Sequence, residues 1–332
     1  MTNEIAVVNS KSFGVYFPHH LDQLNDLGGV DILNIPSNIS QLELASELEQ
    51  YKYIIASVTP YFGKEFFENT PKLKLISRHG LGYNNIDIEA ASANDVYVTK
   101  VKGIIEQEAV AELAVSLIMS LVRKIAQADI SLRTKDWDTR FENVGIEIKD
   151  SVVGIIGYGN IGSRVGDILR DGFKAKIIVY DPSFDEKNLP DKSVTLVTLK
   201  ELLEKSDVIS INASATDSNY HMLGENEIQL MKNNVVVVNT ARGNLVNEYA
   251  IADALNNEDI SGYGADVFEK EPIEKDNPLL KSPNTILTPH IGAYTYPSLK
   301  GMGDKCVNDI QKVIDRQIPD EVINNILESE DE

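Results

Sequence analysis

Three polar side chains in the C-terminal half of the chain follow apolar segments and together have the chemistry of a proton-transfer site. Arg242 comes after the run VVVVN, Glu271 after SGYGADV, and His290 after TILTP. Arginine offers a planar fork for a carboxylate. Histidine transfers protons near neutral pH, and a carboxylate on its other ring nitrogen stabilises the imidazolium. Because ligands of open parallel sheets bind at the carboxyl ends of the strands, we expect the three side chains to converge on one crevice.

A glycine turn upstream of these residues has the pattern of a nucleotide-binding loop. Gly157, Gly159 and Gly162 form G-x-G-x-x-G between the apolar run VVGII and a helical pattern. The first glycine permits a tight turn, the second lets the backbone approach a pyrophosphate, and the third lets the helix pack closely on the strand. The free N–H groups at the helix N-terminus would then face the anion.

An acidic residue, Asp181, directly follows the next apolar run, KIIVY. A carboxylate in this place accepts hydrogen bonds from the adenosine ribose hydroxyls and repels a 2′-phosphate, which favours NAD over NADP. Two alternatives stay open at this point. Asp181 and Pro182 could simply open a turn, or the glycine loop could hold FAD or an adenosine-containing substrate.

The elements that would position these residues are apolar runs separated by helical patterns. Continuous apolar runs of this kind predict parallel sheets buried on both faces, hence an α/β fold. The expected strands of the first region are 5–9, 30–35, 53–57, 73–77 and 96–101, and those of the second region are 152–156, 176–180, 208–212, 235–239, 261–267 and 285–289. Between the regions, 104–125 reads as one amphipathic helix that acts as a stiff link. A further helical stretch begins at Pro297.

Composition excludes several classes of partner. The 332 residues carry 31 Lys and Arg against 51 Asp and Glu, a net charge of −20, which argues against nucleic acid and anionic membranes. The single cysteine, Cys306, allows no internal disulfide and fits a reducing compartment. The N-terminus does not read as a signal peptide, and the longest apolar stretch, 111–122, is too short to span a bilayer. We expect a cytoplasmic protein. No cluster has metal-ligand spacing along the chain, so we expect no metal.

Five motifs are spread along nearly the whole chain: RHGLGYNNID (78–87), the glycine turn, VVNTARGNLVNE, GADVFEKEP and LTPHIGAYT. In the sequence and order of these motifs, the chain resembles the NAD-dependent D-isomer-specific 2-hydroxyacid dehydrogenase family. The resemblance implies two Rossmann-like or flavodoxin-like parallel-sheet domains. The substrate-binding domain would be discontinuous, formed by 1–103 and 296–332, and an NAD-binding Rossmann domain, 104–295, would be inserted into it. The implied activity is the interconversion of a 2-oxo acid and a D-2-hydroxy acid.

The resemblance also implies a role for each matching residue. His290 would be the acid/base and Glu271 its partner, because the family glutamate directly precedes proline; Glu269 is the rival. Arg242 would bind the substrate carboxylate and the reacting oxygen. The implied cofactor-binding residues are Gly157, Gly159, Asn160, Ile161, Gly162, Asp181, Ala241 and Asp266, the last holding the nicotinamide carboxamide. The implied substrate-binding residues are His79, Leu81, Gly82 and Arg242, with the backbone amides of Leu81 and Gly82 receiving the carboxylate.

Some positions leave alternatives open. His79 is either a substrate contact or a satisfied turn residue. Asn212 and Ser214 stand where much of the family has histidine and proline, which affects packing beside the cofactor. Glu106 stands where many members carry asparagine, and its carboxylate would oppose an anionic substrate if it pointed inward. Rival functions are an NAD(H)-sensing corepressor-like binding protein, phosphoglycerate dehydrogenase as the specific activity, and an adenosine-substrate hydrolase.

Two further expectations concern the substrate and the assembly. The loop ASVTPYFGKE after the third expected strand has aromatic residues, no arginine, and Lys64 as its cation. It therefore favours a 2-oxo acid with an apolar side chain over a phosphorylated one. The family is usually dimeric, so we expect a homodimer that buries the arm 131–148 around Trp137. The alternative is a surface excursion with Trp137 in the core of its own chain.

Overall fold

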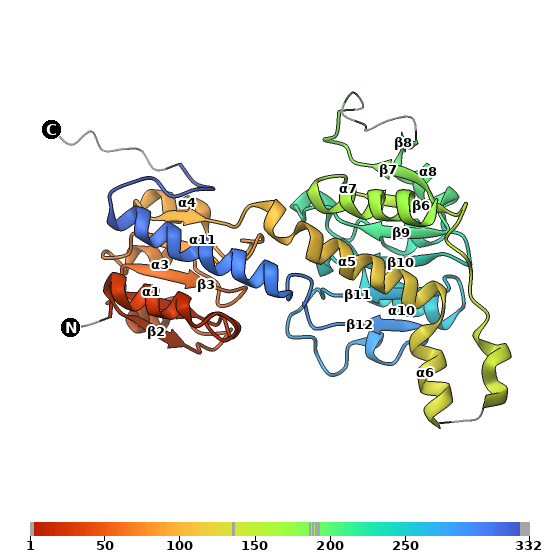
Figure 1. The fold of residues 1–332 in the computed structure, drawn as a ribbon, viewed down its shortest axis with the longest axis horizontal. Helices are drawn as coiled ribbons and strands as arrows, with labels where there is room; N and C mark the ends of the chain where they lie inside the picture. Colours follow the sequence, from red (N-terminus) through yellow and green to blue (C-terminus); the bar gives the residue numbers. More distant parts are fainter. Residues whose placement is uncertain (1–2, 135–136, 186, 188, 190–192, 326–332) are drawn as a thin grey trace. The chain divides into compact units, whose positions relative to one another are not determined.

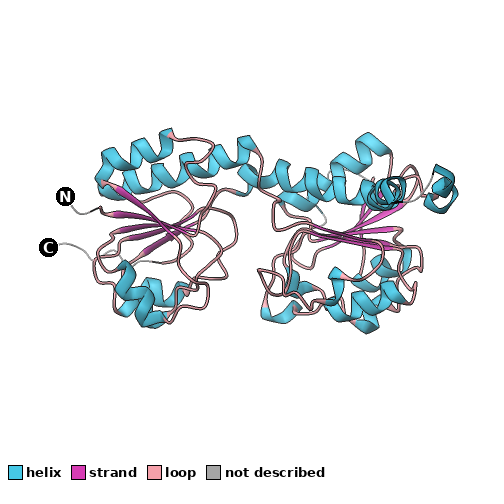
Figure 2. Ribbon diagram, turned by 90° about the horizontal axis from the view of Figure 1, so that it is seen from below, coloured by secondary structure: helices cyan, strands magenta, loops and turns pink. Residues whose placement is uncertain are grey.

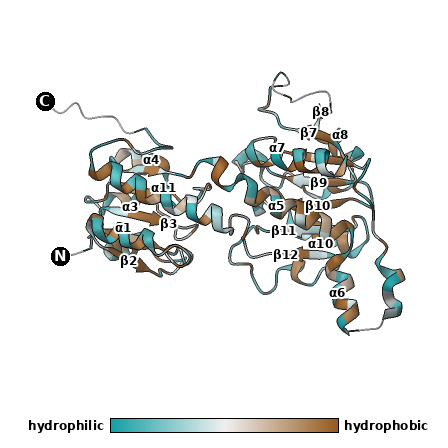
Figure 3. Ribbon diagram, in the orientation of Figure 1, coloured by the Kyte–Doolittle hydropathy of each residue, from teal (hydrophilic) through white to brown (hydrophobic). Residues whose placement is uncertain are grey.

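The computed structural model describes residues 3–134, 137–185, 187, 189 and 193–325, and the chain forms two compact units (Figure 1). One unit comprises Met1–Glu106 and Ala293–Glu332, and the other comprises Gln107–Gly292. Each unit is built on a parallel sheet with helices on both faces (Figure 2). Strands such as β3 (Tyr53–Ala56) are strongly hydrophobic (Figure 3), as burial on both faces requires. The expected α/β fold with two parallel sheets is confirmed.

The first unit has a five-stranded sheet in the order β2-β1-β3-β4-β5, which is the flavodoxin-like order. Its strands are β1 (Ile5–Val8), β2 (Val30–Leu33), β3 (Tyr53–Ala56), β4 (Leu75–Arg78) and β5 (Tyr97–Thr99). Its helices are α1 (His19–Gly28), α2 (Gln41–Leu48), α3 (Lys64–Glu68), α4 (Ile88–Ala93) and α11 (Tyr296–Ile314). Helix α11 confirms the helical stretch expected near Pro297.

Helix α11 completes the core of this unit although it lies far away in the sequence. Cys306 and Ile310 are fully buried in one cluster with residues of β1, β3 and β4. The carboxylate of Asp309 accepts hydrogen bonds from the hydroxyls of Ser77 (2.7 Å) and Thr99 (2.5 Å), in strands β4 and β5. Lys305, in the same helix, pairs with Asp309. The last helix is therefore tied to the sheet by buried apolar and polar contacts.

The second unit has a seven-stranded sheet in the order β12-β11-β10-β9-β6-β7-β8. Its strands are β6 (Val152–Ile156), β7 (Lys176–Tyr180), β8 (Val194–Leu196), β9 (Val208–Ile211), β10 (Val236–Asn239), β11 (Gly262–Ala265) and β12 (Thr285–Leu287). Its main helices are α7 (Asn160–Asp167), α8 (Leu199–Lys205), α9 (Glu225–Ile228) and α10 (Glu248–Asn256). Short 3₁₀ turns lie at Trp137–Asn143, Asp217–Asn219, Gly243–Leu245 and Pro278–Leu280, and a π turn at Ile168–Gly172. The sequence did not indicate β8.

The strand order reverses between β6 and β9, and this point is where ligands bind in open α/β sheets. The glycine turn directly follows β6, so it lies at the reversal. The carboxyl ends of β9, β10, β11 and β12 continue the same edge. The second sheet thus brings the glycine turn and the three polar side chains to one edge of one unit.

The helix expected over 104–125 is shorter in the structure. Helix α5 (Gly103–Val122) ends before Lys124, which has a positive φ of 51°, and a separate helix, α6 (Ile125–Thr134), follows. The prediction of one continuous helix was wrong, because the left-handed residue that ends α5 is a lysine and not a glycine or proline. Among the helices of the described segments, none combines the length and apolar character that a bilayer crossing requires.

Candidate active site

The side chains expected to do chemistry in the second unit extend from the ends of neighbouring strands. Strands β10, β11 and β12 pair in parallel, with Asn239 opposite Ala265 and Ala265 opposite Leu287. Arg242, Glu271 and His290 lie in the loops that leave these three strands.

His290 and Glu271 form a close pair. Nδ1 of His290 lies 2.6 Å from Oε2 of Glu271, and the other carboxylate oxygen accepts a hydrogen bond of 3.0 Å from the backbone N–H of Phe268. Burial acts to raise the pKa of Glu271, but the hydrogen bond and charge of His290, with the Phe268 amide and Arg242, hold it below its ordinary value. Glu271 is therefore a carboxylate. With Nδ1 held in this way, proton exchange with a substrate falls to Nε2 of the ring.

Asp266 organises the loop that carries His290. Its carboxylate accepts hydrogen bonds from the Thr288 hydroxyl (2.6 Å) and from the backbone amides of Ile291 (2.8 Å) and Gly292 (2.7 Å). Burial raises the pKa of Asp266 above its ordinary value, although these three hydrogen bonds oppose the shift. The contacts lie on both sides of His290, whose backbone has a positive φ of 54°. Asp266 thus fixes the backbone on both sides of His290.

Arg242 is held through its backbone. The side chain of Asn239 donates to the carbonyl of Arg242 (2.9 Å) and accepts from the amide of Ala241 (3.0 Å). The guanidinium Nη1 of Arg242 donates to the Ala241 carbonyl at 2.6 Å, and the side chain is half-buried. The buried Asn239 therefore fixes the backbone of this loop. The guanidinium donors of Arg242 other than Nη1 are suited to binding an anion.

The three glycines of the turn meet the three requirements of a dinucleotide loop. Gly157 has φ of 84°, and a Cβ there would lie 2.6 Å from the backbone of Ala213. A Cβ on Gly162 would lie 2.0 Å from the carbonyl oxygen of Gly157, so helix α7 packs directly on the turn. A Cβ on Gly159 would meet no atom within 4 Å, which leaves open space beside the start of α7. The residues present fit a bound pyrophosphate.

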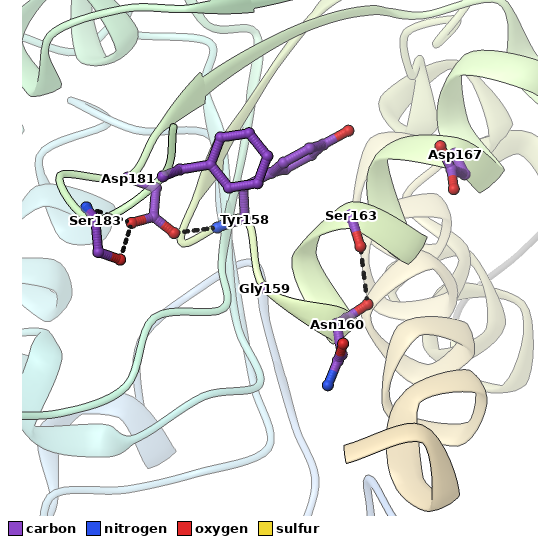
Figure 4. A pocket seen from close by; sticks show the side chains of 8 residues that line it. Tyr158, Gly159, Asn160, Ser163, Asp167, Asp181 and Ser183 are labelled. Carbon is purple, nitrogen blue, oxygen red and sulfur yellow. Dashed lines mark hydrogen bonds between the residues drawn. The ribbon is translucent and has the colours of Figure 1, made fainter. Parts of the chain in front are cut away.

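A pocket of about 470 Å³ adjoins this turn (Figure 4). It is lined by Tyr158, Gly159, Asn160, Ser163, Asp167, Asp181, Ser183 and Phe184. One Asp181 oxygen accepts from the backbone N–H of Tyr158 (2.8 Å), and the other accepts from the amide (2.9 Å) and hydroxyl (2.7 Å) of Ser183. Burial acts to raise the pKa of Asp181, but these hydrogen bonds hold it below its ordinary value. The carboxylate is therefore charged where a ribose is expected.

Sequence reasoning missed the two aromatic residues of this pocket. Tyr158 and Phe184 pack edge to face with ring centroids 5.3 Å apart. Tyr158 occupies a position of the glycine pattern that accepts any residue, and Phe184 lies beyond Asp181 in a loop without periodicity. The sequence therefore gave no signal that either residue lines the pocket. Of the other expected cofactor residues, Asn160 is exposed, Ile161 is half-buried and Ala241 is buried.

The expected substrate loop lies in the first unit, after β4. The backbone N–H of His79 donates to the carbonyl of Ala56 (3.0 Å), and its Nδ1 lies 2.9 Å from the hydroxyl of Ser10. Burial, the neighbouring Arg78 and His20 lower the pKa of His79 to about 3, so the ring is neutral. The buried ring packs edge to face on Phe13. Leu81 and Gly82, which follow it, are half-buried.

The three positions that depart from the family pattern, Asn212, Ser214 and Glu106, lie in different environments. The Asn212 side-chain amide donates to the carbonyl (3.2 Å) and hydroxyl (3.0 Å) of Ser210, and the next residue, Ala213, contacts Gly157. Ser214 is exposed. Glu106 is buried in the first turn of α5.

A separate polar cluster in the first unit joins α1 to α11. Nε2 of His20 lies 2.9 Å from Oδ1 of Asp304, and Nε2 of His19 lies 3.8 Å from the same oxygen. Lys300 binds the other oxygen of Asp304 at 2.6 Å. Within the part of the chain that the structure describes, this is the group that brings three possible metal ligands within 4.8 Å of one another. His20 is 284 residues from Asp304, so spacing along the chain does not indicate the cluster.

Comparison with known proteins identifies the family. The family model described as D-isomer specific 2-hydroxyacid dehydrogenase, NAD binding domain, matches residues 115–292. A glyoxylate reductase of Thermococcus litoralis is 34% identical over 287 residues, 85% of this chain and 86% of that protein. A D-3-phosphoglycerate dehydrogenase of Methanocaldococcus jannaschii is 34% identical over 309 residues, 92% of this chain and 58% of that protein.

A solved structure agrees with these matches. The D-lactate dehydrogenase of Aquifex aeolicus, complexed with NAD and lactic acid, superposes with a TM-score of 0.85 at 28% identity. The superposition covers 97% of this chain and 100% of the D-lactate dehydrogenase chain. The chain therefore belongs to the D-isomer-specific 2-hydroxyacid dehydrogenases, a family of NAD-dependent oxidoreductases.

Proposed function

We propose that the protein reduces small 2-oxo acids with an apolar side chain to D-2-hydroxy acids and catalyses the reverse oxidation. The observation that carries this proposal is the 2.6 Å contact between His290 and Glu271 at the edge of the sheet that also carries Arg242. NADH, when bound, supplies the hydride to C2 of the oxo acid. His290 donates its Nε2 proton to the C2 oxygen, and Glu271 stabilises the imidazolium that the forward step consumes.

Arg242 supplies the remaining function in this proposal. Its planar guanidinium binds the substrate carboxylate and draws the carbonyl oxygen toward the proton donor. Asp266 and Asn239 contribute rigidity, because each fixes the backbone of a loop that carries a reacting side chain. Gly157, Gly159, Gly162 and Asp181 bind the dinucleotide. We also propose that the first unit is the substrate-binding domain, with the amides of Leu81 and Gly82 receiving the carboxylate, and that the His79 side chain supports this loop from within.

Two cations of the first unit, Arg78 and Lys64, already have partners within the protein, which favours a substrate with an apolar side chain. Arg78 is buried, and its Nη1 donates to the carbonyls of Ala56 (3.0 Å) and His79 (2.9 Å). Lys64 is exposed in the first turn of α3 and lies 3.7 Å from Glu68. A second anionic group on the substrate would therefore lack a prepared partner, which is costly.

The aromatic residues of this region differ in their accessibility. Phe62 is fully buried in the core of the first unit, so it cannot line a pocket as the sequence suggested. Tyr61 and Val58, in the same loop, are 50% and 43% exposed. Tyr294 and Tyr296, after His290, are 55% and 67% exposed. These exposed side chains offer apolar surface for a substrate, and each buried methylene would add about 0.8 kcal/mol.

Oxidation of NADH with a panel of 2-oxo acids tests the proposal. The panel contains glyoxylate, pyruvate, 2-oxoisocaproate, phenylpyruvate and phosphohydroxypyruvate. We expect turnover, with a lower KM for the branched or aromatic acids than for glyoxylate and the lowest kcat/KM for phosphohydroxypyruvate. The highest kcat/KM for phosphohydroxypyruvate would overturn the preference for an apolar side chain. No turnover with any acid would favour an NAD(H)-sensing binding protein.

We further propose a cytoplasmic homodimer that buries the arm 131–148. Large apolar side chains of this arm and of α6 are solvent-exposed in the single chain, namely Ile130, Leu132, Trp137, Phe141 and Val144. Trp137 is 66% exposed, so the alternative that placed it in the core of its own chain was wrong. Sedimentation at micromolar concentration should give a dimer, and Trp137→Glu should give monomers; a wild-type monomer would refute the assembly.

A further inference from the structure

The loop that carries Glu271 contains a second histidine–glutamate pair, which the proposed reaction does not use. Oε2 of Glu269 lies 3.1 Å from Nε2 of His221, and the hydroxyl of Tyr220 donates to Oε1 of the same carboxylate. The rings of Tyr220 and His221 stack with centroids 3.9 Å apart and planes inclined by 20°. Glu269 therefore binds two side chains from one neighbouring segment at once.

The backbone of Glu269 is held as firmly as its side chain. Its N–H donates to Oε1 of Glu248 at 2.8 Å, and Glu248 is buried in the first turn of α10. The other oxygen of Glu248 accepts from the side-chain amide of Asn277 at 2.6 Å. A Cβ on Gly243 would lie 1.9 Å from the Phe268 carbonyl carbon and 2.2 Å from the Glu269 nitrogen, so the two loops touch directly.

The segment that binds Glu269 is itself fixed to the loop after Arg242. The backbone N–H of His221 donates to the carbonyl of Asn244 (2.8 Å), and that of Leu223 donates to the carbonyl of Leu245 (3.0 Å). On its other side, Glu269 adjoins Phe268, whose amide holds one oxygen of Glu271. A continuous set of contacts thus runs from the Arg242 loop, through His221 and Glu269, to the carboxylate that orients His290.

We propose that Glu269 is a positioning residue, whose carboxylate, clamped by Tyr220 and His221, sets the place of Glu271 relative to His290. This inference rests on the proposed function, in which His290 and Glu271 carry out proton transfer. It gives a role to the different partners of Glu269 and Glu271 in this loop. Glu271 contacts the reacting histidine, and Glu269 contacts Tyr220 and His221 and fixes the loop.

The decisive variants are Glu269→Ala, Glu269→Gln and Tyr220→Phe, with Glu274→Ala as the matched control. Glu274 lies in the same loop and pairs with Lys270, and both side chains are more than half exposed. Glutamine keeps one oxygen that accepts from Tyr220, so Glu269→Gln should rescue most of the activity. Glu269→Ala should lower kcat between about 10-fold and 100-fold, since a displacement of about 1 Å in a supporting group has effects of this size.

Two readouts separate positioning from general stability. The KM for the oxo acid and the Kd of NADH should change little in Glu269→Ala, while kcat falls. In proton NMR, the downfield resonance of the His290 Nδ1–H in its short hydrogen bond to Glu271 should weaken or disappear in Glu269→Ala and persist in Glu269→Gln and Glu274→Ala. If Glu269→Ala does not fold, Tyr220→Phe decides, with a smaller fall in kcat and a shift of the same resonance.

The inference and the proposed function fail in different ways. Wild-type kcat together with an unchanged His290 resonance in Glu269→Ala would overturn the positioning role and leave the dehydrogenase activity standing. A wild-type protein that reduces no oxo acid would overturn the activity, and the resonance would still report whether Glu269 sets the contact between Glu271 and His290. A loss of activity in Glu274→Ala equal to that in Glu269→Ala would show a non-specific loop effect and would also overturn the inference.

Discussion

The carboxylate of Asp181 accepts a hydrogen bond of 2.8 Å from the backbone amide of Tyr158, inside the glycine turn. The residue expected to recognise the ribose therefore also shapes the loop expected to bind the pyrophosphate. Asp181→Ala should weaken NADH binding by about 1.5–3 kcal/mol, the range for hydrogen bonds to a charged group, and raise the relative use of NADPH. Fluorescence titration and the ratio of kcat/KM for the two cofactors measure this, with the exposed Asp185→Ala as control. A wild-type preference for NADPH would contradict the assignment.

Two glycines of the turn should respond differently to the same substitution. Gly162→Ala places a Cβ 2.0 Å from the Gly157 carbonyl oxygen and should lower stability by about 1–3 kcal/mol. Gly159→Ala meets no protein atom within 4 Å, so its melting temperature should match wild type while its affinity for NADH falls, because the methyl group occupies the space beside the start of α7. Calorimetry and NADH titration test the pair. Normal NADH affinity in Gly159→Ala would place the pyrophosphate elsewhere.

His290→Ala should lower kcat by about 10² to 10⁴, since general acid catalysis typically contributes that factor. The affinity for NADH should stay near wild type, because the residues assigned to the dinucleotide are untouched. Stopped-flow measurement of NADH oxidation and a separate binding titration distinguish the two quantities. His221→Ala is the useful comparison, because it removes the other histidine paired with a glutamate of this loop. If His221→Ala lost more activity than His290→Ala, the two pairs would have been assigned in the wrong order.

The lowered pKa of Glu271 predicts how its contribution to stability depends on pH. Above the ordinary glutamate value both the folded and unfolded chains carry the charge, and the contacts to His290 and Phe268 favour the folded state. As pH falls below that value, the unfolded chain binds the proton first, so the contribution is lost as pH drops through the lower pKa of the folded state. Urea unfolding of wild type and Glu271→Gln between about pH 7 and about pH 3 should give curves that converge toward acid. A difference that grows toward acid would contradict the lowered pKa of Glu271.

Periodicity was enough to predict both sheets, because strands buried on two faces must be continuously apolar. It failed where an element is short or is ended by an unusual backbone. Strand β8 has three residues, one of them exposed, and gives no such run. The break after α5 depends on the left-handed backbone of Lys124, and lysine carries no local signal for that conformation.

The family resemblance implied that Glu271, rather than Glu269, partners His290, because the family glutamate directly precedes proline, and in the structure Glu271 contacts His290. The contacts that hold these residues were not predictable in the same way. Asp266 binds amides 25 and 26 residues further along the chain, and His79 meets Ser10 across 69 residues. These partners come together only in the folded chain, so residue spacing in a single sequence does not reveal them.

The burial of Asp309 against Ser77 and Thr99 has a consequence for how the chain acquires its structure during synthesis. The residues of the second unit are contiguous, so all of its strands are synthesised before α11. Until then one face of the first sheet lacks the cover that Cys306 and Ile310 later provide. An incomplete apolar face of this kind is prone to association with other chains. The sheet of the first unit is therefore synthesised first but completed last. Slow elongation over α11 would prolong the exposure of its uncovered apolar face.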